Sequence, residues 1–355
     1  MIRKTRETSL NIETIKNYTH FLEIPLKFVA CWDWYKKPKR EYEWIVNYMY
    51  LALVLFVLAD LSASLLVHLW TEWMDVMNSL GEIADGLPLV ASVAIVAYFA
   101  IYKSELYDLI DFMNLNFKSH SARGLTNMTM LKSYNYAKSF AYFYTACTLF
   151  SVTIYVILPV IAHLWTKQPL QPWIYSDASS TSVIVFVFLK QCVGQAFVAL
   201  AVGQLGVFFA SNAILLCGQL DLVCCSLRNA RYTALLKGGV HHAALMPAHA
   251  DILEDERHNY IYNRSEFLDS CYNYDDKLTL CIGHKTKYDI YESAYDVETS
   301  EALRECARLC QVINQYKEKF EAFVSPLLVL RVVQVTLYLC MLLYAATEVL
   351  FLWKC

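Results

Sequence analysis

The stretch VIVFVFLKQCVGQAFVALAVGQLGVFFASNAILLC, residues 183–217, contains only one charged side chain, that of Lys190. About 20 predominantly apolar residues cross a bilayer as a helix, because hydrocarbon tolerates only a backbone whose hydrogen bonds are satisfied internally. The stretch is longer than this minimum. It predicts a membrane-spanning helix, and the rest of the chain has to fit beside it.

Composition extends this interpretation to the whole chain, because 57% of the residues are hydrophobic and only 18% are charged. The net charge of -3 and the lack of a basic patch interleaved with aromatic residues argue against a nucleic-acid partner. We therefore predict an all-α, polytopic helix bundle whose surroundings are the lipid bilayer. The five predicted spans are 45–69, 87–102, about 140–165, 183–217 and about 323–353.

The distribution of Lys and Arg predicts the orientation of these spans. The segment 1–44 holds nine Lys and Arg residues, whereas the loop 68–87 holds none and carries acidic residues instead. Basic residues collect on the cytoplasmic side of short loops. We expect a cytoplasmic N-terminus and four parts: a cytoplasmic segment 1–44, a bundle of spans 1–4 with a cytosolic helix extension at 45–237, an acidic cytoplasmic insertion at 238–300, and a cytosolic helix with span 5 at 301–355.

Two amphipathic segments flank that insertion. After span 4 and before span 5, apolar residues recur three or four positions apart, which places them on one face of a helix. The residues that we expect to pack in these cytosolic helices are Leu220, Val223, Leu227, Leu303, Cys310 and Ile313. Such faces need a partner surface, which is either the other amphipathic helix or a neighbouring subunit.

The insertion is rich in Tyr, Asp and Glu and also contains His241, His242 and His249. The spacing of these histidines matches no standard metal-ligand pattern, so solvated histidines are the simpler interpretation. We predict neither a metal site nor another cofactor.

Two charges fall within predicted spans at similar depth. Asp60 lies in the outer half of span 1 and Lys190 in the outer half of span 4, so they could pair and bracket a polar pocket. The interpretation that we favour is simpler: Lys190 reaches outward to the interface, and Asp60 accepts hydrogen bonds from nearby hydroxyls such as those of Ser62 and Ser64.

Several segments give the chain a resemblance to the insect odorant receptors, a family of odorant-gated cation channels. They are the Trp32-Asp33-Trp34 region, PLQPWIYSD at 169–177, CGQLDLVCCSLRNA at 217–230, and LRECARLCQVINQYKEKFEAFVSPLLVLRVVQVTLYLC at 303–340. The last of these is similar to the helix that leads into the family's fifth span. Many relatives have a histidine where this chain offers Leu309 or Cys310. Because family members have seven spans, we expect the chain to stop before the sixth and seventh. Coexpression of residues 1–355 with the coreceptor should then give no odorant-evoked current beyond that of the coreceptor alone.

The resemblance implies a tuning subunit that assembles with the family's coreceptor into a heterotetrameric channel in the plasma membrane of sensory dendrites. The ligand would be a small, volatile, mostly apolar molecule, bound in the outer half of the bundle. The matching depths bring five candidates to this pocket: Ser92, Ser151, Tyr155, Phe188 and Gln191. Ordinary packing is the simpler role for each of them, although Ser151 and Tyr155 share a helix face.

Two other classes of protein remain as alternatives. A gustatory receptor of the same superfamily would be separated only by a C-terminal signature beyond residue 355. A polytopic membrane enzyme would need convergent histidines or carboxylates, and the sequence has neither a His-x-x-x-His nor an Asp-Asp-x-x-Asp cluster, nor a Gly-x-Ser-x-Gly or P-loop motif. We therefore predict a receptor and not an enzyme.

Overall fold

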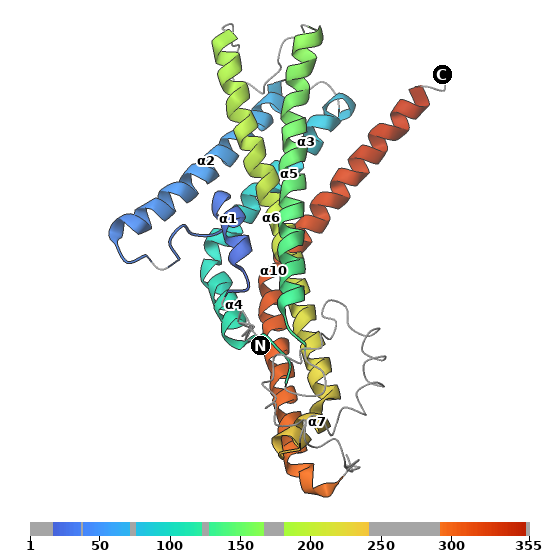
Figure 1. The fold of residues 1–355 in the computed structure, drawn as a ribbon. Helices are drawn as coiled ribbons and strands as arrows, with labels where there is room; N and C mark the ends of the chain where they lie inside the picture. The colour runs from blue at the N-terminus through green and yellow to red at the C-terminus, as the bar shows by residue number, and fades with distance from the viewer. Residues whose placement is uncertain are drawn as a thin grey trace, which may run out of the picture. The chain divides into compact units, whose positions relative to one another are not determined.

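The computed structural model describes residues 17–36, 38–71, 76–122, 128–166, 181–240 and 292–352, and all regular elements within these ranges are helices (Figure 1). This confirms the predicted all-α class. In chain order the helices are α1 (His20–Phe28), α2 (Glu41–Thr71), α3 (Val76–Ile101), α4 (Lys103–Asn116), α5 (Leu131–Thr166), α6 (Thr181–Arg228), α7 (Ala230–Lys237), the short η3 (Ser293–Tyr295) and α10 (Asp296–Leu352).

Five helices in the described ranges are long and apolar enough to cross a membrane, as predicted: α2, α3, α5, α6 and α10. Two of them continue well past the length that a bilayer needs. Helix α6 runs without a break into the amphipathic stretch that ends at Arg228, and α10 joins the amphipathic segment before span 5 to the span itself. Each predicted pair of span and extension is therefore one helix.

The predicted start of the second span is wrong. We placed it at residue 87 because Pro88 is favoured in the first turn of a helix, yet the apolar helix begins at Ser79 and carries Pro88 in its interior. Proline there leaves the carbonyl of Ala84 without its usual N–H donor, which membrane helices tolerate when neighbouring groups compensate. Glu82 and Asp85 consequently belong to α3 and not to an outer loop.

The described residues divide into two compact units, and long helices contribute to both. The second unit comprises Thr19–Ile110, Ser139–Ala210 and Phe320–Cys355. In it α2 packs against α3 and α6 at glycines: a Cβ on Gly86 would lie 3.3 Å from Leu65 Cδ2, and one on Gly194 would lie 2.9 Å from Leu61 Cδ2. Helices α5 and α6 run side by side (Figure 1), joined by a 2.9 Å hydrogen bond from Gln204 to Thr145.

Aromatic side chains fill the core of this second unit where α3, α6 and α10 meet. The rings of Phe99 and Phe323 have centroids 5.5 Å apart, and the ring of Phe208 lies 5.9 Å from that of Phe99. Tyr98 adds a 2.9 Å hydrogen bond from its hydroxyl to the backbone carbonyl of Phe323. Edge-to-face aromatic pairs of this kind contribute about 0.5–1.5 kcal/mol beyond the area they bury.

The first unit is built by the amphipathic extensions. Val223 of α6 packs with Leu309 and Ile313 of α10 in a buried cluster that Cys310 borders. The buried hydroxyl of Tyr316 lies 2.7 Å from the side-chain oxygen of Asn212, to which it donates a hydrogen bond. The two amphipathic helices are therefore each other's partner along one face.

Three of the six residues expected in these cytosolic helices do not join that cluster. Leu220, Leu227 and Leu303 keep 46%, 45% and 46% of their surface exposed. Cys310 is partly buried, and only Val223 and Ile313 are buried. The contact between α6 and α10 thus leaves these three leucines nearly half exposed.

The two sides of the acidic insertion are joined by one arginine. Residues 241–291, including His241, His242 and His249, lie outside the described ranges. Arg231 of α7 donates to the Thr299 hydroxyl at 2.6 Å and to the Glu292 carbonyl at 2.7 Å, and its guanidinium lies 3.1 Å from the Asp296 carboxylate. The guanidinium fixes the start of α10 beside α7.

Candidate functional site

Asp60 of α2 and Lys190 of α6 form an ion pair between the Lys190 ammonium and Oδ2 of Asp60. This contradicts the separate partners that we favoured from the sequence. Ser62 and Ser64 each use their only hydroxyl proton on a backbone carbonyl four residues earlier, that of Leu58 and that of Asp60 respectively, both at 2.8 Å. Because those protons do not reach the Asp60 carboxylate, the lysine supplies the compensating charge.

Two further polar contacts connect neighbouring spans, one between α2 and α3 and one between α3 and α5. Nε2 of His68 on α2 lies 3.4 Å from Oε1 of Glu82 on α3. The Tyr155 hydroxyl on α5 and the Asp85 carboxyl group on α3 lie close enough to interact. Together with the ion pair, these contacts tie α2, α3, α5 and α6 to one another through polar groups inside helices that are otherwise apolar. Charged residues inside membrane-spanning helices are rare, and they mark functional positions more often than they serve only in packing.

The five predicted pocket residues lie on α3, α5 and α6 in different surroundings. Tyr155 is 49% exposed and interacts with Asp85. Gln191 is buried directly beside Lys190, and Phe188 is half-buried. Ser92 is fully buried and donates its hydroxyl to the Leu89 carbonyl at 2.7 Å, whereas Ser151 is exposed. The serine on α3 is thus satisfied by its own helix.

Sequence reasoning missed Asp85, Glu82 and His68 as members of this site. The first two were assigned to an outer loop because the second span was started too late, and His68 was placed at the end of span 1. A signal was available: the residues from Ser79 onward form an apolar helix if Glu82 and Asp85 are allowed as paired charges. Only the partners provided by α2 and α5 make that assignment reasonable.

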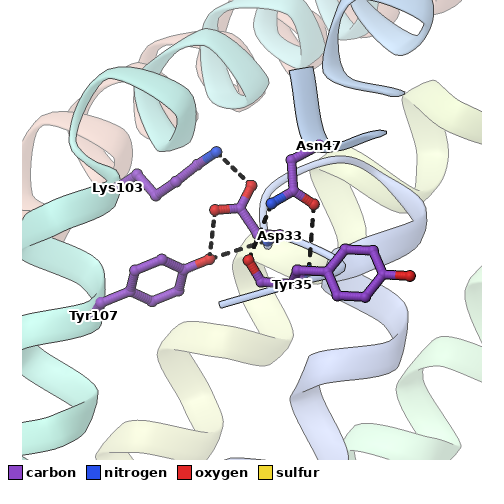
Figure 2. A network of polar contacts seen from close by, with 5 residues as sticks. All are labelled: Asp33, Tyr35, Asn47, Lys103 and Tyr107. Carbon is purple, nitrogen blue, oxygen red and sulfur yellow. Dashed lines mark hydrogen bonds and ion pairs between the residues drawn. The ribbon is translucent and has the colours of Figure 1, made fainter. Parts of the chain in front are cut away.

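A second polar network surrounds the Trp32-Asp33-Trp34 region (Figure 2). The Lys103 ammonium lies 2.6 Å from Oδ1 of Asp33, and the Tyr107 hydroxyl donates to Oδ2 at 3.0 Å. The same hydroxyl accepts the backbone N–H of Asp33 at 3.1 Å. Trp32 is buried with its ring edge-on to Tyr107 at 5.7 Å. Both the side-chain carboxylate and the backbone N–H of Asp33 are therefore held against α4.

The first helix turns of α2 hold the other side of this loop. The Asn47 side chain accepts the backbone N–H of Tyr35 at 3.2 Å and donates to the Tyr35 carbonyl at 3.0 Å, as Figure 2 shows. Burial raises the pKa of Tyr107 above its ordinary value of 10.0. Tyr107 consequently stays a neutral phenol at physiological pH and can donate its proton to Asp33. The network is a set of charge-assisted hydrogen bonds that anchors the N-terminal segment.

The side chains of both networks can form hydrogen bonds and ion pairs that position helices and bind polar groups. Among the residues that the structure describes, no group of three or more His, Cys, Asp or Glu side chains is arranged to hold a metal ion. The helices, their five spans and the polar contacts between them define a multi-pass α-helical membrane protein with polar groups placed inside the bundle.

The particular family follows from comparison with known proteins. A model of the 7tm odorant receptor family matches residues 87–354, so the chain belongs to the odorant receptor family. The match is to the odorant receptors and not to the gustatory alternative, and the family is one of receptors rather than enzymes.

Two curated relatives from Drosophila melanogaster are similar to most of the chain. The putative odorant receptor 85e is 25% identical over 321 residues, which cover 89% of this chain and 66% of the relative. Odorant receptor 83a is 24% identical over 260 residues, which cover 72% of this chain and 54% of the relative. The chain thus spans just under two thirds of the length of the first relative and about half of the length of the second.

A solved structure supports the same architecture. The insect olfactory receptor OR5 from Machilis hrabei superposes with a TM-score of 0.52 over 91% of this chain and 69% of that receptor, at 11% sequence identity. At that identity the likeness establishes the fold alone.

Proposed function

We propose that the protein is the ligand-binding subunit of an odorant-gated cation channel in the plasma membrane of sensory dendrites, with its N-terminus in the cytoplasm. The observation that carries this proposal is the odorant receptor family match, which covers 87–354 and therefore four of the five spans. The excess of Lys and Arg before α2 supports the orientation.

The ligand that this site suits is a small, volatile, mostly apolar molecule with one polar group. Apolar walls bind such a molecule, while a few fixed polar side chains orient it. Tyr155, which is partly exposed and fixed by Asp85, is the best placed of the predicted pocket residues to meet the polar group. Gln191 lies next in sequence to the Lys190 ion pair and is the second choice. Ser92, Ser151 and Phe188 remain weaker candidates.

The partner that the family suggests is the shared coreceptor. The exposed leucines of the first unit, Leu220, Leu227 and Leu303, support an assembly surface, because leucines that are nearly half exposed on helices outside the membrane favour contact with another subunit. Ligand binding would open the channel by contacting the open state more favourably than the closed one.

The test is to express the receptor in its full-length form with the coreceptor and record currents during exposure to a broad panel of volatiles. We expect at least one volatile to evoke a current that cells with coreceptor alone lack. For that volatile, Tyr155→Phe should raise the half-maximal concentration by about tenfold, the equivalent of about 1.4 kcal/mol, because it removes one hydroxyl and keeps the ring.

Thr153→Ala is the matched control, because Thr153 is an exposed neighbour on the same helix whose hydroxyl donates to the Leu149 carbonyl at 2.8 Å. It should leave the concentration dependence unchanged. If surface labelling shows the receptor in the plasma membrane with the coreceptor and the whole panel still gives only the coreceptor's own response, the proposed function is wrong.

A further inference from the structure

Helix α1 carries large apolar side chains in two different environments. Phe21, Leu22 and Leu26 are buried. Ile24 and Phe28, which lie one helical turn apart, stay exposed at 62% and 51%. The buried set is ordinary packing. Exposing large apolar side chains to water would be costly, so Ile24 and Phe28 call for a partner beyond the described residues.

The exposed face of α1 continues as a row of side chains to α2. The ring of Phe28 lies 6.1 Å from that of Trp34, and the ring of Trp34 lies 5.7 Å from that of Tyr50. Tyr50 also donates its hydroxyl to the Phe28 carbonyl at 2.7 Å. We call Ile24, Phe28, Trp34 and Tyr50 the aromatic ridge. Phe28, Trp34 and Tyr50 touch through their rings and a hydrogen bond, and Ile24 lies one helical turn before Phe28 on the same face of α1, so the ridge is one continuous surface.

The position of Tyr50 on α2 gives the depth of the ridge relative to the bilayer. Between Asn47 and His68, the residues 48–67 carry one charge, at Asp60. At about 1.5 Å per residue, this run of about 20 residues matches the hydrocarbon thickness of about 30 Å. Tyr50 therefore lies just inside the hydrocarbon boundary at the start of α2. Trp44 and Tyr48, stacked at 6.1 Å and both exposed, lie at the same end of the helix.

The ridge cannot turn away from that boundary, because the loop that carries it is fixed on two sides. Asp33 is held to Lys103 and Tyr107, and Tyr35 is held to Asn47 (Figure 2). Trp34 stands between these two anchored residues in the sequence. The exposed surface is thus presented in one direction relative to the start of α2.

We propose that the aromatic ridge lies in the lipid itself, at the boundary between headgroups and acyl chains of the leaflet that surrounds the start of α2. Phospholipid is the occupant because the ridge is continuous with a membrane-spanning helix at interfacial depth. It also has the composition of interfacial segments: Trp and Tyr for the boundary and Ile and Phe for the acyl chains. Lys39 and Arg40, next to the start of α2, suit the phosphate level.

The function of this contact is to fix the N-terminal segment to the membrane and, through Asp33, to fix the start of α4. Helix α4 follows α3 directly, since only Tyr102 separates them. The lipid contact would therefore restrain the end of a spanning helix as well as the N-terminal segment. This inference depends on the chain spanning a bilayer and does not depend on which ligand the receptor binds.

Depth-dependent quenching in vesicles tests the proposal with the complete protein. An environment-sensitive fluorescent amino acid is introduced at position 24 by codon suppression, which leaves the native cysteines untouched. The vesicles contain phospholipids with a nitroxide near the headgroup or near the chain end. We expect a blue-shifted emission, and quenching about twofold stronger or more by the shallow nitroxide than by the deep one.

Position 297 is the control, because Val297 is 69% exposed but lies in the first unit at the start of α10. The probe there should emit as in water and escape both nitroxides. A second labelled protein, with the probe at position 34, keeps the test valid if substitution at position 24 prevents folding. Emission at position 24 like that at position 297 overturns the proposal, and so does a probe shielded from water and from both nitroxides, which would indicate a protein partner.

Discussion

The Asp60–Lys190 pair shows at the scale of single residues how a charge is kept within a membrane helix. A carboxylate at that depth is costly unless it is paired, and the pair is worth less than its Coulomb attraction because both groups give up water. In the structure the Lys190 side chain is 38% exposed and that of Asp60 20%. The cost of breaking the pair should therefore be smaller than for a fully buried one.

Lys190→Met should destabilise the protein because it leaves Asp60 without its cation. We expect a loss of about 2 kcal/mol, below the values found for fully buried pairs. Thermal unfolding of the purified protein in nanodiscs measures the change. The double variant Asp60→Asn with Lys190→Met should recover most of the loss, because no unpaired charge remains.

Ser62→Ala is the control for this experiment, since its hydroxyl bonds only within α2 to the Leu58 carbonyl in the geometry described above. It should change the unfolding temperature little. A double variant that is as unstable as the sum of its two single variants would contradict an ion pair.

Tyr107→Phe tests the network around Asp33 and its dependence on pH. Loss of the hydroxyl removes a donor to the Asp33 carboxylate and should weaken attachment of the N-terminal segment by about 1–2 kcal/mol. Because burial raises the pKa of Tyr107, the neutral phenol is favoured in the folded state. The contribution of Tyr107 is therefore constant below the unfolded pKa of about 10 and is lost as pH rises above it.

Hydrogen exchange of residues 20–35, compared between the native protein and Tyr107→Phe, measures this difference. We expect faster exchange in the variant from pH 6 to 9 and a shrinking difference above about pH 10. Equal exchange in the two proteins at neutral pH would show that the hydroxyl does not hold the segment.

At the scale of elements, two glycines of α6 occupy different surroundings. A Cβ on Gly218 would lie 2.7 Å from Ser133 Cβ and 2.9 Å from Met130 Sδ, so α6 approaches the beginning of α5 closely there. A Cβ on Gly206 would meet nothing closer than the Tyr144 hydroxyl at 3.9 Å. The first glycine permits a close helix contact, whereas the second has room for a side chain.

Gly218→Ala should destabilise the protein by about 1–3 kcal/mol, because the contact with Ser133 is not made by a flexible side-chain end and the helices must move apart. Gly206→Ala is the matched control and should be neutral or stabilising by up to about 1 kcal/mol, since alanine favours the helix. Both are measured as changes in unfolding temperature. Equal destabilisation by the two substitutions would show that helix α5 does not constrain position 218.

The elements also show which features of this fold the sequence could predict. Hydropathy placed all five spans, and periodicity placed the amphipathic continuation of α6, because both depend on local composition. The predicted start of α3 was wrong because a proline is favoured in the first turn of a helix, and the partners that make charges at Glu82 and Asp85 acceptable within the span come from other helices. Contacts between helices, such as Asp60 with Lys190, were a possibility in the sequence that geometry had to decide.

At the scale of the whole molecule, the candidate site was predictable in type but not in membership. The sequence singled out Tyr155 as a pocket residue and Asp60 and Lys190 as charges within spans. Asp85, which positions Tyr155, could not be recognised without knowing that α3 and α5 lie together. The assembly faces were similarly half predictable, since periodicity gives a stripe of leucines and does not say which of them the second helix covers.

The exposed part of that stripe leads to a prediction about assembly. Leu220 and Leu227 lie seven residues apart on α6, which puts them on one helix face, and both are nearly half exposed. Replacing both with Glu would put two charges where a neighbouring subunit would be. We expect recovery of the receptor with its coreceptor, measured by co-purification in mild detergent, to fall by about tenfold or more, because a buried unpaired charge costs at least about 1.4 kcal/mol.

The unfolding temperature separates this effect from a loss of folding. It should change little in the Leu220→Glu, Leu227→Glu protein, because both side chains are nearly half exposed and neither belongs to the buried cluster of Val223, Leu309 and Ile313. Gln311→Glu, an exposed polar position on α10, is the control and should assemble normally.

Val223→Ala should affect stability and not assembly. It opens a cavity between α6 and α10 and should lower stability by about 1–3 kcal/mol without a selective loss of assembly. If the leucine pair assembles as well as the native protein, subunits meet through another surface, and the exposed face of α6 is not the assembly surface.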